Sequence, residues 1–236
     1  MRIFDVSFTG GMERTSCVRS FRFDCAEKID FLPGQFLKLI FDEAAPENGE
    51  LNKYLSFSCS PHRGYIEVTK KLTGSGFSLR LQALKTGEKV KLQAPMGRCT
   101  LNPEYSRVGF ICGGIGITPV ISMIDYMAYK GFPADAVLFY SNRTAEETAF
   151  KRDLDLWKTG NDRLKVHYAV TDCRPPEEDC FYGRIDRAFI EERDPLFKER
   201  TVFIFGPPVM VTEMRGICSQ IGCLGSNIKS EGFTGY

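Results

Sequence analysis

Three glycines follow an apolar run directly in the middle of this chain, and this succession narrows its possible folds sharply. Residues 108–112 have the length and apolar character of a strand in a parallel sheet that is covered on both faces. Gly113, Gly114 and Gly116 then let the backbone turn tightly and approach a ligand, because no Cβ atom obstructs it. The segment predicts a phosphate-binding corner between a strand and a helix.

The helix start after the glycines completes this corner. Thr118 suits the N-cap and Pro119 suits the first helical position, so the amides of residues 117–120 would point outward with the positive end of the helix dipole. A pyrophosphate group fits such a site. A tight turn without a ligand explains the glycines equally well, and their spacing does not match the dinucleotide fingerprint G-x-G-x-x-G.

Composition allows an ordinary globular protein. The 236 residues are 43% hydrophobic and 26% charged, which is enough to bury a core in one large or two small domains. The net charge is +1 and the first half is mildly basic, which suits an anionic cofactor or an acidic redox partner rather than a nucleic acid. No apolar run approaches the ~20 residues that span a bilayer, and the N-terminus lacks a signal-peptide core. We expect a cytoplasmic protein without an integral membrane segment.

The nine cysteines form no Cys-x-x-Cys pair, so neither a disulfide framework, nor a zinc site, nor a plant-type iron–sulfur cluster is expected. For Cys173 and Cys180, two free thiols are favoured over a redox pair. The two histidines argue against His-centred metal or acid–base chemistry. We expect no metal site.

Two patterns divide the chain. Residues 1–101 read as short strands separated by turns, which predicts a small antiparallel β-barrel with one helix at 75–84. Residues 102–236 alternate strands and helices, which predicts an α/β domain with a parallel sheet and ligands at the carboxyl ends of its strands. The barrel strands are expected at 3–9, 17–24, 35–41, 54–59, 65–70 and 89–94. The second half is expected to hold strands at 108–112, 136–140, 164–170 and 201–205 and helices at 119–129, 145–159, 186–192 and 208–221.

Candidate ligand contacts occur in both halves. Lys53 and Ser56 place a cation and a hydroxyl at a strand start, although a solvated lysine is the simplest alternative. Residues 76–78 open the barrel helix and could hold phosphate, although helix capping also explains them. Residues 141–143 follow a strand of the second half and could grip a ribose or a 2′-phosphate. Residues 206–208 follow another strand, so two glycine turns are expected at one rim of the sheet.

In their order and spacing, these motifs resemble those of the ferredoxin–NADP reductase family, and within it those of the compact stand-alone FAD-dependent reductases. The resemblance covers the chain from end to end. Its motifs are PGQF (33–36), KYLS (53–56), GFS (76–78), PMG (95–97), GGIGITP (113–119), YSNRT (140–144), GRI (183–185), GPP (206–208) and SEGFTGY (230–236).

The resemblance implies a barrel that binds FAD rather than FMN, an α/β domain that binds NADPH or NADH, and a flavin at their junction. The family's flavin motif is Arg-x-Tyr/Phe-Ser, and this chain departs from it at Lys53 and Leu55. Lysine gives a point charge in place of a bidentate fork, and leucine cannot stack on the flavin ring. Reorientation of Tyr54, edge contacts to the flavin, or an exchanging flavin are the alternatives. Ser56 matches the family serine that lies near flavin N5.

Further contacts are carried over from the family. By resemblance, Phe57 and Ser58 offer backbone groups to the flavin, and Gly76, Phe77 and Ser78 lie at its phosphates. The second set serves the nicotinamide nucleotide and comprises Gly113, Gly114, Gly116, Thr118, Pro119, Ser141, Asn142, Arg143, Gly206 and Pro207. Phe205 replaces a cysteine that many relatives have before this glycine. Glu231, Phe233 and Tyr236 would close the flavin pocket, with a disordered tail as the alternative.

The implied reaction is hydride transfer from NAD(P)H to bound FAD beside the catalytic Ser56, followed by single-electron transfer to a ferredoxin, a flavodoxin or an oxygenase component. Ser141 and Arg143 favour NADPH slightly over NADH. One alternative is an NAD(P)H:flavin reductase whose flavin exchanges. Another is a non-catalytic nucleotide-binding or redox-sensing module.

Overall fold

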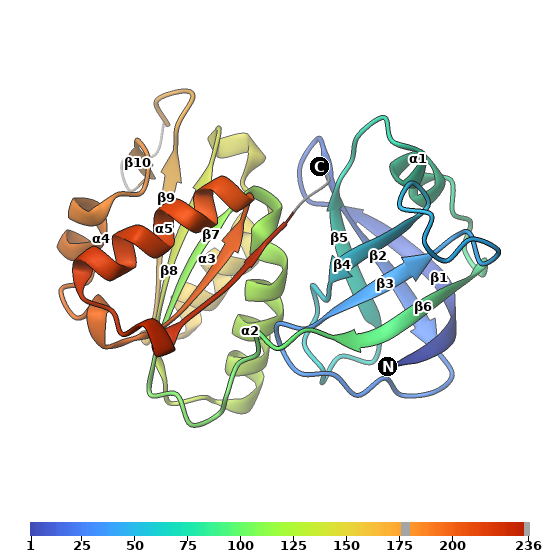
Figure 1. The fold of residues 1–236 in the computed structure, drawn as a ribbon, viewed down its shortest axis with the longest axis horizontal. Helices are drawn as coiled ribbons and strands as arrows, with labels where there is room; N and C mark the ends of the chain where they lie inside the picture. Colours follow the sequence, from blue (N-terminus) through green and yellow to red (C-terminus); the bar gives the residue numbers. More distant parts are fainter. Residues whose placement is uncertain (176–179, 234–236) are drawn as a thin grey trace. The chain divides into compact units, whose positions relative to one another are not determined.

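The computed structural model describes residues 1–175 and 180–233. The chain divides into two compact units, each with its own sheet (Figure 1). The first unit comprises Met1–Leu101 together with Thr118–Tyr129. The second comprises Asn102–Ile117 and the described residues between Lys130 and Phe233. Residues 118–129 therefore group with the first unit, although they follow the start of the second in the sequence.

Six antiparallel strands form the sheet of the first unit, in the order β4-β3-β6-β1-β2-β5. The two edge strands of this sheet meet in an isolated bridge between Phe57 and Val68, which closes it into a small barrel. The elements are β1 Arg2–Glu13, β2 Val18–Cys25, β3 Phe36–Ile40, β4 Asn52–Ser56, β5 Ile66–Lys71, α1 Gly76–Gln82 and β6 Lys89–Met96.

The barrel interior follows the two-residue period of its strands. Phe21 and Phe23 of β2 and Val68 of β5 are buried in one apolar cluster, whereas Arg22 between the two phenylalanines is half-buried on the other face. Phe77 of α1 is fully buried in the same cluster and caps the barrel interior at one end.

Helix α2, Ile117–Lys130, is fastened to the barrel loop that precedes β5. The Ser122 hydroxyl donates to the Cys59 carbonyl at 2.6 Å. The Arg63 guanidinium makes two bonds to the Asp125 carboxylate, at 2.7 and 2.9 Å. Because the Asp125 side chain is buried, this paired geometry holds the helix in one register on the loop.

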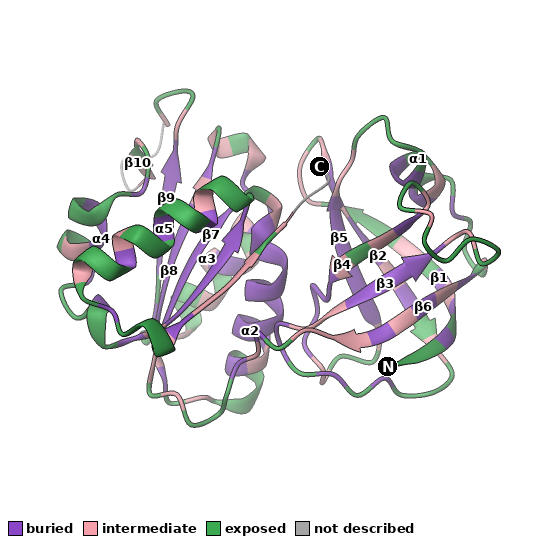
Figure 2. Ribbon diagram, in the orientation of Figure 1, coloured by how far each residue is buried: buried purple, intermediate pink, exposed green. Residues whose placement is uncertain are grey.

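Six parallel strands form the sheet of the second unit, in the order β10-β9-β8-β7-β11-β12. Figure 2 shows β7, β8 and β9 buried along most of their length, as a parallel sheet covered on both faces requires. The strands are β7 Arg107–Gly113, β8 Asp135–Asn142, β9 Leu164–Val170, β10 Cys180–Tyr182, β11 Thr201–Gly206 and β12 Ile228–Gly232. The remaining α-helices are α3 Lys151–Gly160, α4 Arg187–Arg193 and α5 Pro208–Ile221.

The predicted fold class, an antiparallel barrel followed by an α/β parallel sheet, is confirmed. The prediction of one helix over residues 145–159 is wrong. A 3₁₀ turn at Ala145–Glu147 precedes α3, and Phe150 lies between the two. Phe150 has a φ of 62°, which is outside the right-handed helical region and interrupts the helix. Strands β10 and β12 were not expected, since they are short edge strands without a clear alternating pattern.

Among the described residues, no helix is long and apolar enough to cross a membrane.

The buried guanidinium of Arg200 connects segments at the amino-terminal ends of strands in the second sheet. Arg200 precedes β11 and is 2% exposed. Its side chain donates to the Asp194 carboxylate, to the Asp135 carbonyl at 2.7 Å and to the Asp135 carboxylate at 3.1 Å. A buried charge is tolerated when its partners are placed in this way.

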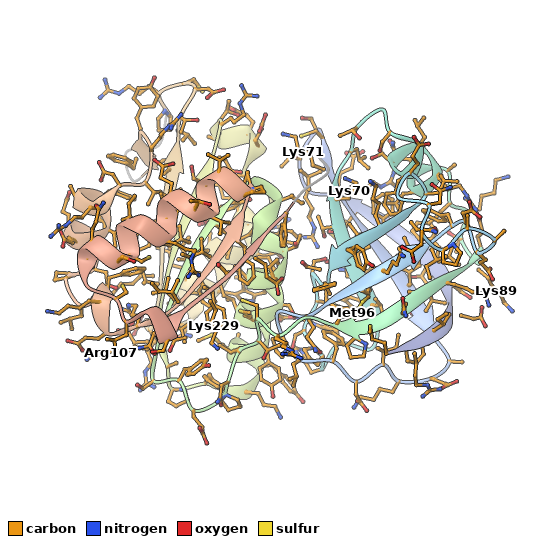
Figure 3. All side chains as sticks on the ribbon, in the orientation of Figure 1. Lys70, Lys71, Lys89, Met96, Arg107 and Lys229 are labelled. Carbon is orange, nitrogen blue, oxygen red and sulfur yellow. The ribbon has the colours of Figure 1, made fainter. Side chains whose placement is uncertain are left out.

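Replacement Arg200→Met is expected to lower the free energy of unfolding by about 3 kcal/mol, because it leaves the buried Asp194 carboxylate unpaired. Urea denaturation measures the change. Arg107→Met is the control, because Arg107, labelled in Figure 3, pairs with Glu199 in a largely exposed setting and should cost at most about 1 kcal/mol. An equal decrease in the free energy of unfolding in both variants would contradict a special contribution from the buried Arg200–Asp194 pair.

His167 of β9 is held neutral inside the second unit. Its ring stacks on Phe139 with centroids 5.2 Å apart. Burial, assisted by the charge of Arg193, lowers the pKa of His167 to about 4. The unfolded chain, with a histidine pKa near 6.5, therefore binds more protons than the folded protein between about pH 6.5 and pH 4.

Stability contributed by neutral His167 should be present above pH 6.5 and should decline as the pH falls toward 4. His167→Phe keeps the aromatic contact and removes the titration. Urea denaturation at pH 7.5 and pH 4.5 measures the free energy of unfolding of both proteins. The value for the variant, relative to that of the parent protein, should be higher at pH 4.5 than at pH 7.5. A constant difference between the two proteins at both pH values would refute this assignment.

Candidate functional site

The carboxyl ends of β7, β8 and β11 bring the glycine turns of the second unit together. Gly113 pairs with Ser141 in the register of β7 and β8. Gly206 ends β11, and a Cβ atom built on it would lie 3.4 Å from the Gly113 backbone nitrogen. The Met210 side chain from the first turn of α5 covers both glycines. The expected meeting of two glycine turns at one rim is therefore present.

Gly116 is required by close backbone packing. A Cβ atom at this position would lie 2.5 Å from the Phe205 carbonyl oxygen and 2.9 Å from the Gly206 Cα atom. Gly114, two residues earlier, has a φ of 53°, in the left-handed region that favours glycine. The turn that leads into α2 thus lies directly against the end of β11, and no larger residue fits between them.

The helix starts earlier than the sequence indicated. Residues 114–116 form a 3₁₀ turn and α2 begins at Ile117. The expectation that Thr118 is the N-cap is wrong, since Thr118 is the second residue of α2 and Pro119 the third. Both are buried. The amide-rich start of the helix is consequently formed by the glycine turn itself.

Tyr140 and Asn142 support the rim from β8. The Tyr140 hydroxyl donates to the Gly114 carbonyl at 3.2 Å. The amide nitrogen of Asn142 is buried and has no hydrogen-bond partner among the described residues. An unpaired buried polar group is costly, and a polar ligand or a water molecule at this rim would offset that cost.

Arg143 is held by the end of β9. Its guanidinium donates to the Asp172 carboxylate at 2.8 Å, and the backbone N–H groups of Thr171 and Asp172 donate to its carbonyl. The Thr171 hydroxyl and Arg143 both lower the pKa of Asp172. The pair places a carboxylate beside the arginine that was expected to bind a 2′-phosphate.

The segment that resembles the family's flavin motif, residues 53–56, lies on the edge strand β4, and its side chains are divided between two faces. Leu55 packs against the barrel core. Tyr54 is 60% exposed and contacts Phe36 edge-on and the Lys38 ammonium group. Tyr54 therefore lies on the opposite face from Lys53 and Leu55, as the strand period requires. The structure gives no aromatic replacement at position 55.

Lys70 of β5 is a functional candidate that the sequence reasoning missed. It is 7% exposed, and its pKa is lowered by burial and then by the positive charge of Lys53. Figure 3 shows Lys70 and Lys71 together at the end of β5. Two lysines brought together from the two edge strands of the barrel fit an anionic group such as a diphosphate. The sequence signal that could have indicated this candidate is the pair of adjacent lysines, Lys70 and Lys71, shortly before α1.

The residues after Lys53 are placed as follows. Ser56 is 8% exposed at the end of β4. The N–H groups of Phe57 and Ser58 already donate to the carbonyls of Gln35 and Glu67, so any flavin contact from these two residues must use other atoms. The Ser58 hydroxyl is likewise engaged inside the barrel wall, at 3.1 Å from the Glu67 carboxylate.

The start of α1 is stabilised by its own serines. Ser75 is the N-cap and accepts from the Ser78 N–H at 3.3 Å. Ser78 is buried and Gly76 is exposed. Capping accounts for these contacts without a ligand, and phosphate binding at residues 76–78 stays a prediction.

The C-terminal residues continue along β11. Glu231 pairs with Phe205 in the register of β11 and β12. The Phe233 N–H donates to the Gly206 carbonyl at 2.8 Å, and its ring stacks near Phe205 with centroids 6.2 Å apart. Tyr236 lies outside the described residues. Phe205 itself is fully buried within the second unit.

A glycine-lined rim on a parallel sheet, preceded by a barrel with two neighbouring lysines, is an arrangement that suits a nucleotide ligand. Residues 110–216 match the family model described as an oxidoreductase NAD-binding domain. Over 216 residues the chain is 27% identical to the reductase component 1 of terephthalate 1,2-dioxygenase from Comamonas sp, covering 90% of this chain and 62% of that protein. The resemblance to ferredoxin–NADP reductase-type FAD/NAD oxidoreductases that the motifs indicated is confirmed by these similarities.

Two further similarities span most of both proteins. NADH-cytochrome b5 reductase 1 from Dictyostelium discoideum is 28% identical over 221 residues, covering 89% of this chain and 75% of that protein. The cytochrome b5 reductase domain of Ulva prolifera nitrate reductase superposes with a TM-score of 0.83 at 20% identity, covering 98% of this chain and 97% of that domain. The chain thus spans 62% of the Comamonas relative but nearly all of the algal domain.

Gly116→Ala is expected to destabilise the second unit by at least about 2 kcal/mol, because the added methyl group overlaps the backbone of β11. Gly216→Ala is the matched control in the exposed interior of α5, where a Cβ atom meets nothing within 4 Å. The control should be stabilised by about 0.5–1 kcal/mol. Thermal denaturation compares them, and a harmless Gly116→Ala would contradict the close packing.

Proposed function

We propose that this protein is an FAD-dependent NAD(P)H oxidoreductase that passes electrons singly to a separate protein acceptor. The observation that carries the proposal is the close-packed glycine rim at the carboxyl ends of β7 and β11, which suits a nucleotide diphosphate. The similarity to the ferredoxin–NADP reductase family supports the cofactor assignment, because a similar solved structure is a flavohemoglobin with bound FAD.

The first unit holds the flavin in this proposal. Lys53 and Lys70 bind its diphosphate, and a diphosphate favours FAD over FMN. Ser56, at the end of β4, hydrogen-bonds the flavin ring near N5. A bound flavin supplies the conversion of a two-electron hydride into single electrons, while the residues of the chain bind and orient it.

The second unit binds the nicotinamide nucleotide, and we propose NADH as the preferred donor. Asp172 already pairs with Arg143, so a 2′-phosphate at this position would meet a carboxylate, whereas a ribose hydroxyl can donate to it. This proposal departs from the slight preference for NADPH that Ser141 and Arg143 gave in the sequence. The curated relatives named NADH-cytochrome b5 reductase support it.

The acceptor in this proposal is a ferredoxin, a flavodoxin, an oxygenase component or a haem protein. Relatives named as a dioxygenase reductase component and as cytochrome b5 reductases support a protein acceptor of this range. The mildly basic first half of the chain favours an acidic partner.

A second function, an NAD(P)H:flavin reductase with an exchanging flavin, is favoured by one observation. Tyr54 faces away from Lys53 and Leu55, so position 55 offers no aromatic surface for the flavin ring. Loss of flavin during gel filtration would select this function over the electron-transfer reductase.

The visible spectrum of the purified protein, followed by anaerobic additions of NADH and NADPH, tests the proposal. A ~450 nm band that bleaches faster with NADH is expected. Colour that appears when flavin is supplied but is lost on gel filtration would indicate the exchanging reductase. A protein that stays colourless with both FAD and FMN would leave a non-catalytic nucleotide-binding or redox-sensing module.

Ser56→Ala is expected to slow flavin reduction in single turnover by about tenfold or more, since a hydrogen bond that positions the reacting ring is lost. Its affinity for NAD⁺ should change little. Ser60→Ala is the control, because Ser60 is a buried serine of the same segment whose hydroxyl bonds to His62. Unchanged reduction in Ser56→Ala, or equal slowing in both variants, would count against this role.

A further inference from the structure

The hydroxyl of Tyr140 holds the carbonyl of the glycine turn. This carbonyl, on Gly114, accepts two bonds, one from the Tyr140 hydroxyl at 3.2 Å and one from the Ile117 N–H at the start of α2. Both acceptor positions of the oxygen are therefore used. The peptide units of the turn are fixed from two sides, and their orientation decides where the amides between Gly114 and Ile117 point.

Tyr140 is placed to do this from inside the sheet. Its side chain is fully buried in β8, and burial, followed by the neighbouring Cys112, raises the pKa of its hydroxyl well above the usual value. Asn142 and the Ala149 backbone lie close enough to act in the opposite direction. The phenol thus stays protonated at all physiological pH values and acts as a donor.

The segment that leads to α3 lies near the same phenol, since the Ala149 backbone acts on the pKa of the Tyr140 hydroxyl. Ala149 precedes Phe150, which has a left-handed φ of 62° that is unusual for a bulky residue. Such backbone strain persists where surrounding contacts determine it, and it occurs often at ligand sites. Tyr140 therefore links the glycine turn after β7 with the loop after β8, the two segments that rim the nucleotide site.

We propose that Tyr140 is a positioning residue for the dinucleotide, whose hydroxyl sets the orientation of the glycine-turn amides that receive the pyrophosphate. The inference rests on the proposed function, since it assumes that this rim binds a nicotinamide dinucleotide. Tyr140 makes no contact with the ligand in this role. It acts through Gly114 and the first turn of α2.

The packing of Tyr140 alone does not require a hydroxyl. A phenylalanine would fill the same space in this buried position, and burying a hydroxyl is unfavourable unless it makes hydrogen bonds. Tyr168, its register partner on β9, provides the comparison. The Tyr168 hydroxyl bonds to the Asp155 carboxylate of α3 at 2.8 Å and does not reach the glycine turn.

Calorimetric titration of the FAD-loaded protein with NAD⁺ tests the inference through Tyr140→Phe and the matched Tyr168→Phe. Loss of the Tyr140 hydroxyl should weaken NAD⁺ binding about fivefold, the effect of one neutral hydrogen bond. Tyr168→Phe should bind NAD⁺ within about twofold of the parent protein. The FAD affinity of both variants should be unchanged.

Stopped-flow reduction by NADH supplies a second readout that a purely structural role would not move. Tyr140→Phe should raise the NADH concentration for half-maximal reduction while the maximal rate stays the same, because binding alone is weakened. Equal NAD⁺ affinity in Tyr140→Phe and the parent protein, or a parallel loss in Tyr168→Phe, would overturn the inference while leaving the proposed function intact. Failure of the parent protein itself to bind NAD⁺ would remove both.

Discussion

Direct backbone contact between the glycine turn and the end of β11 is the constraint on which the second unit depends. Gly116 approaches the Phe205 carbonyl so closely that a single methyl group would separate the two segments. This contact brings the start of α2 against the neighbouring strand and sets the glycines of β7 and β11 side by side. Tyr140 then fixes the turn from the third strand, so three adjacent strands determine one small surface.

Electrostatics in the first unit favour an anionic ligand. Burial, and then the positive charge of Lys53, lower the pKa of Lys70. An anion bound between the two lysines would relieve the repulsion of their charges. Flavin binding and the stability of the barrel should therefore be linked, because a ligand that binds the folded state alone stabilises it.

The fold was largely predictable because strong local patterns agree with the tertiary structure. The apolar runs of β7, β8 and β11 are buried on both faces, and the limits of β9 and α5 match the expected ranges. The break before α3 was not predictable, since tertiary contacts hold Phe150 in a conformation that its sequence disfavours. Lys70 was missed for a related reason, because its burial beside Lys53 arises from strands that are distant in sequence.

The fastening of α2 bears on how such a protein can be divided. The helix begins at the glycine turn, yet the stacking of His62 on Tyr129, with centroids 3.8 Å apart, and the Arg63–Asp125 pair tie it to a barrel loop. A fragment that ends at Leu101 would lack this helix and leave the loop without its partner. The two units are thus interleaved along the chain, and neither can be exchanged as a cassette by one cut in the gene.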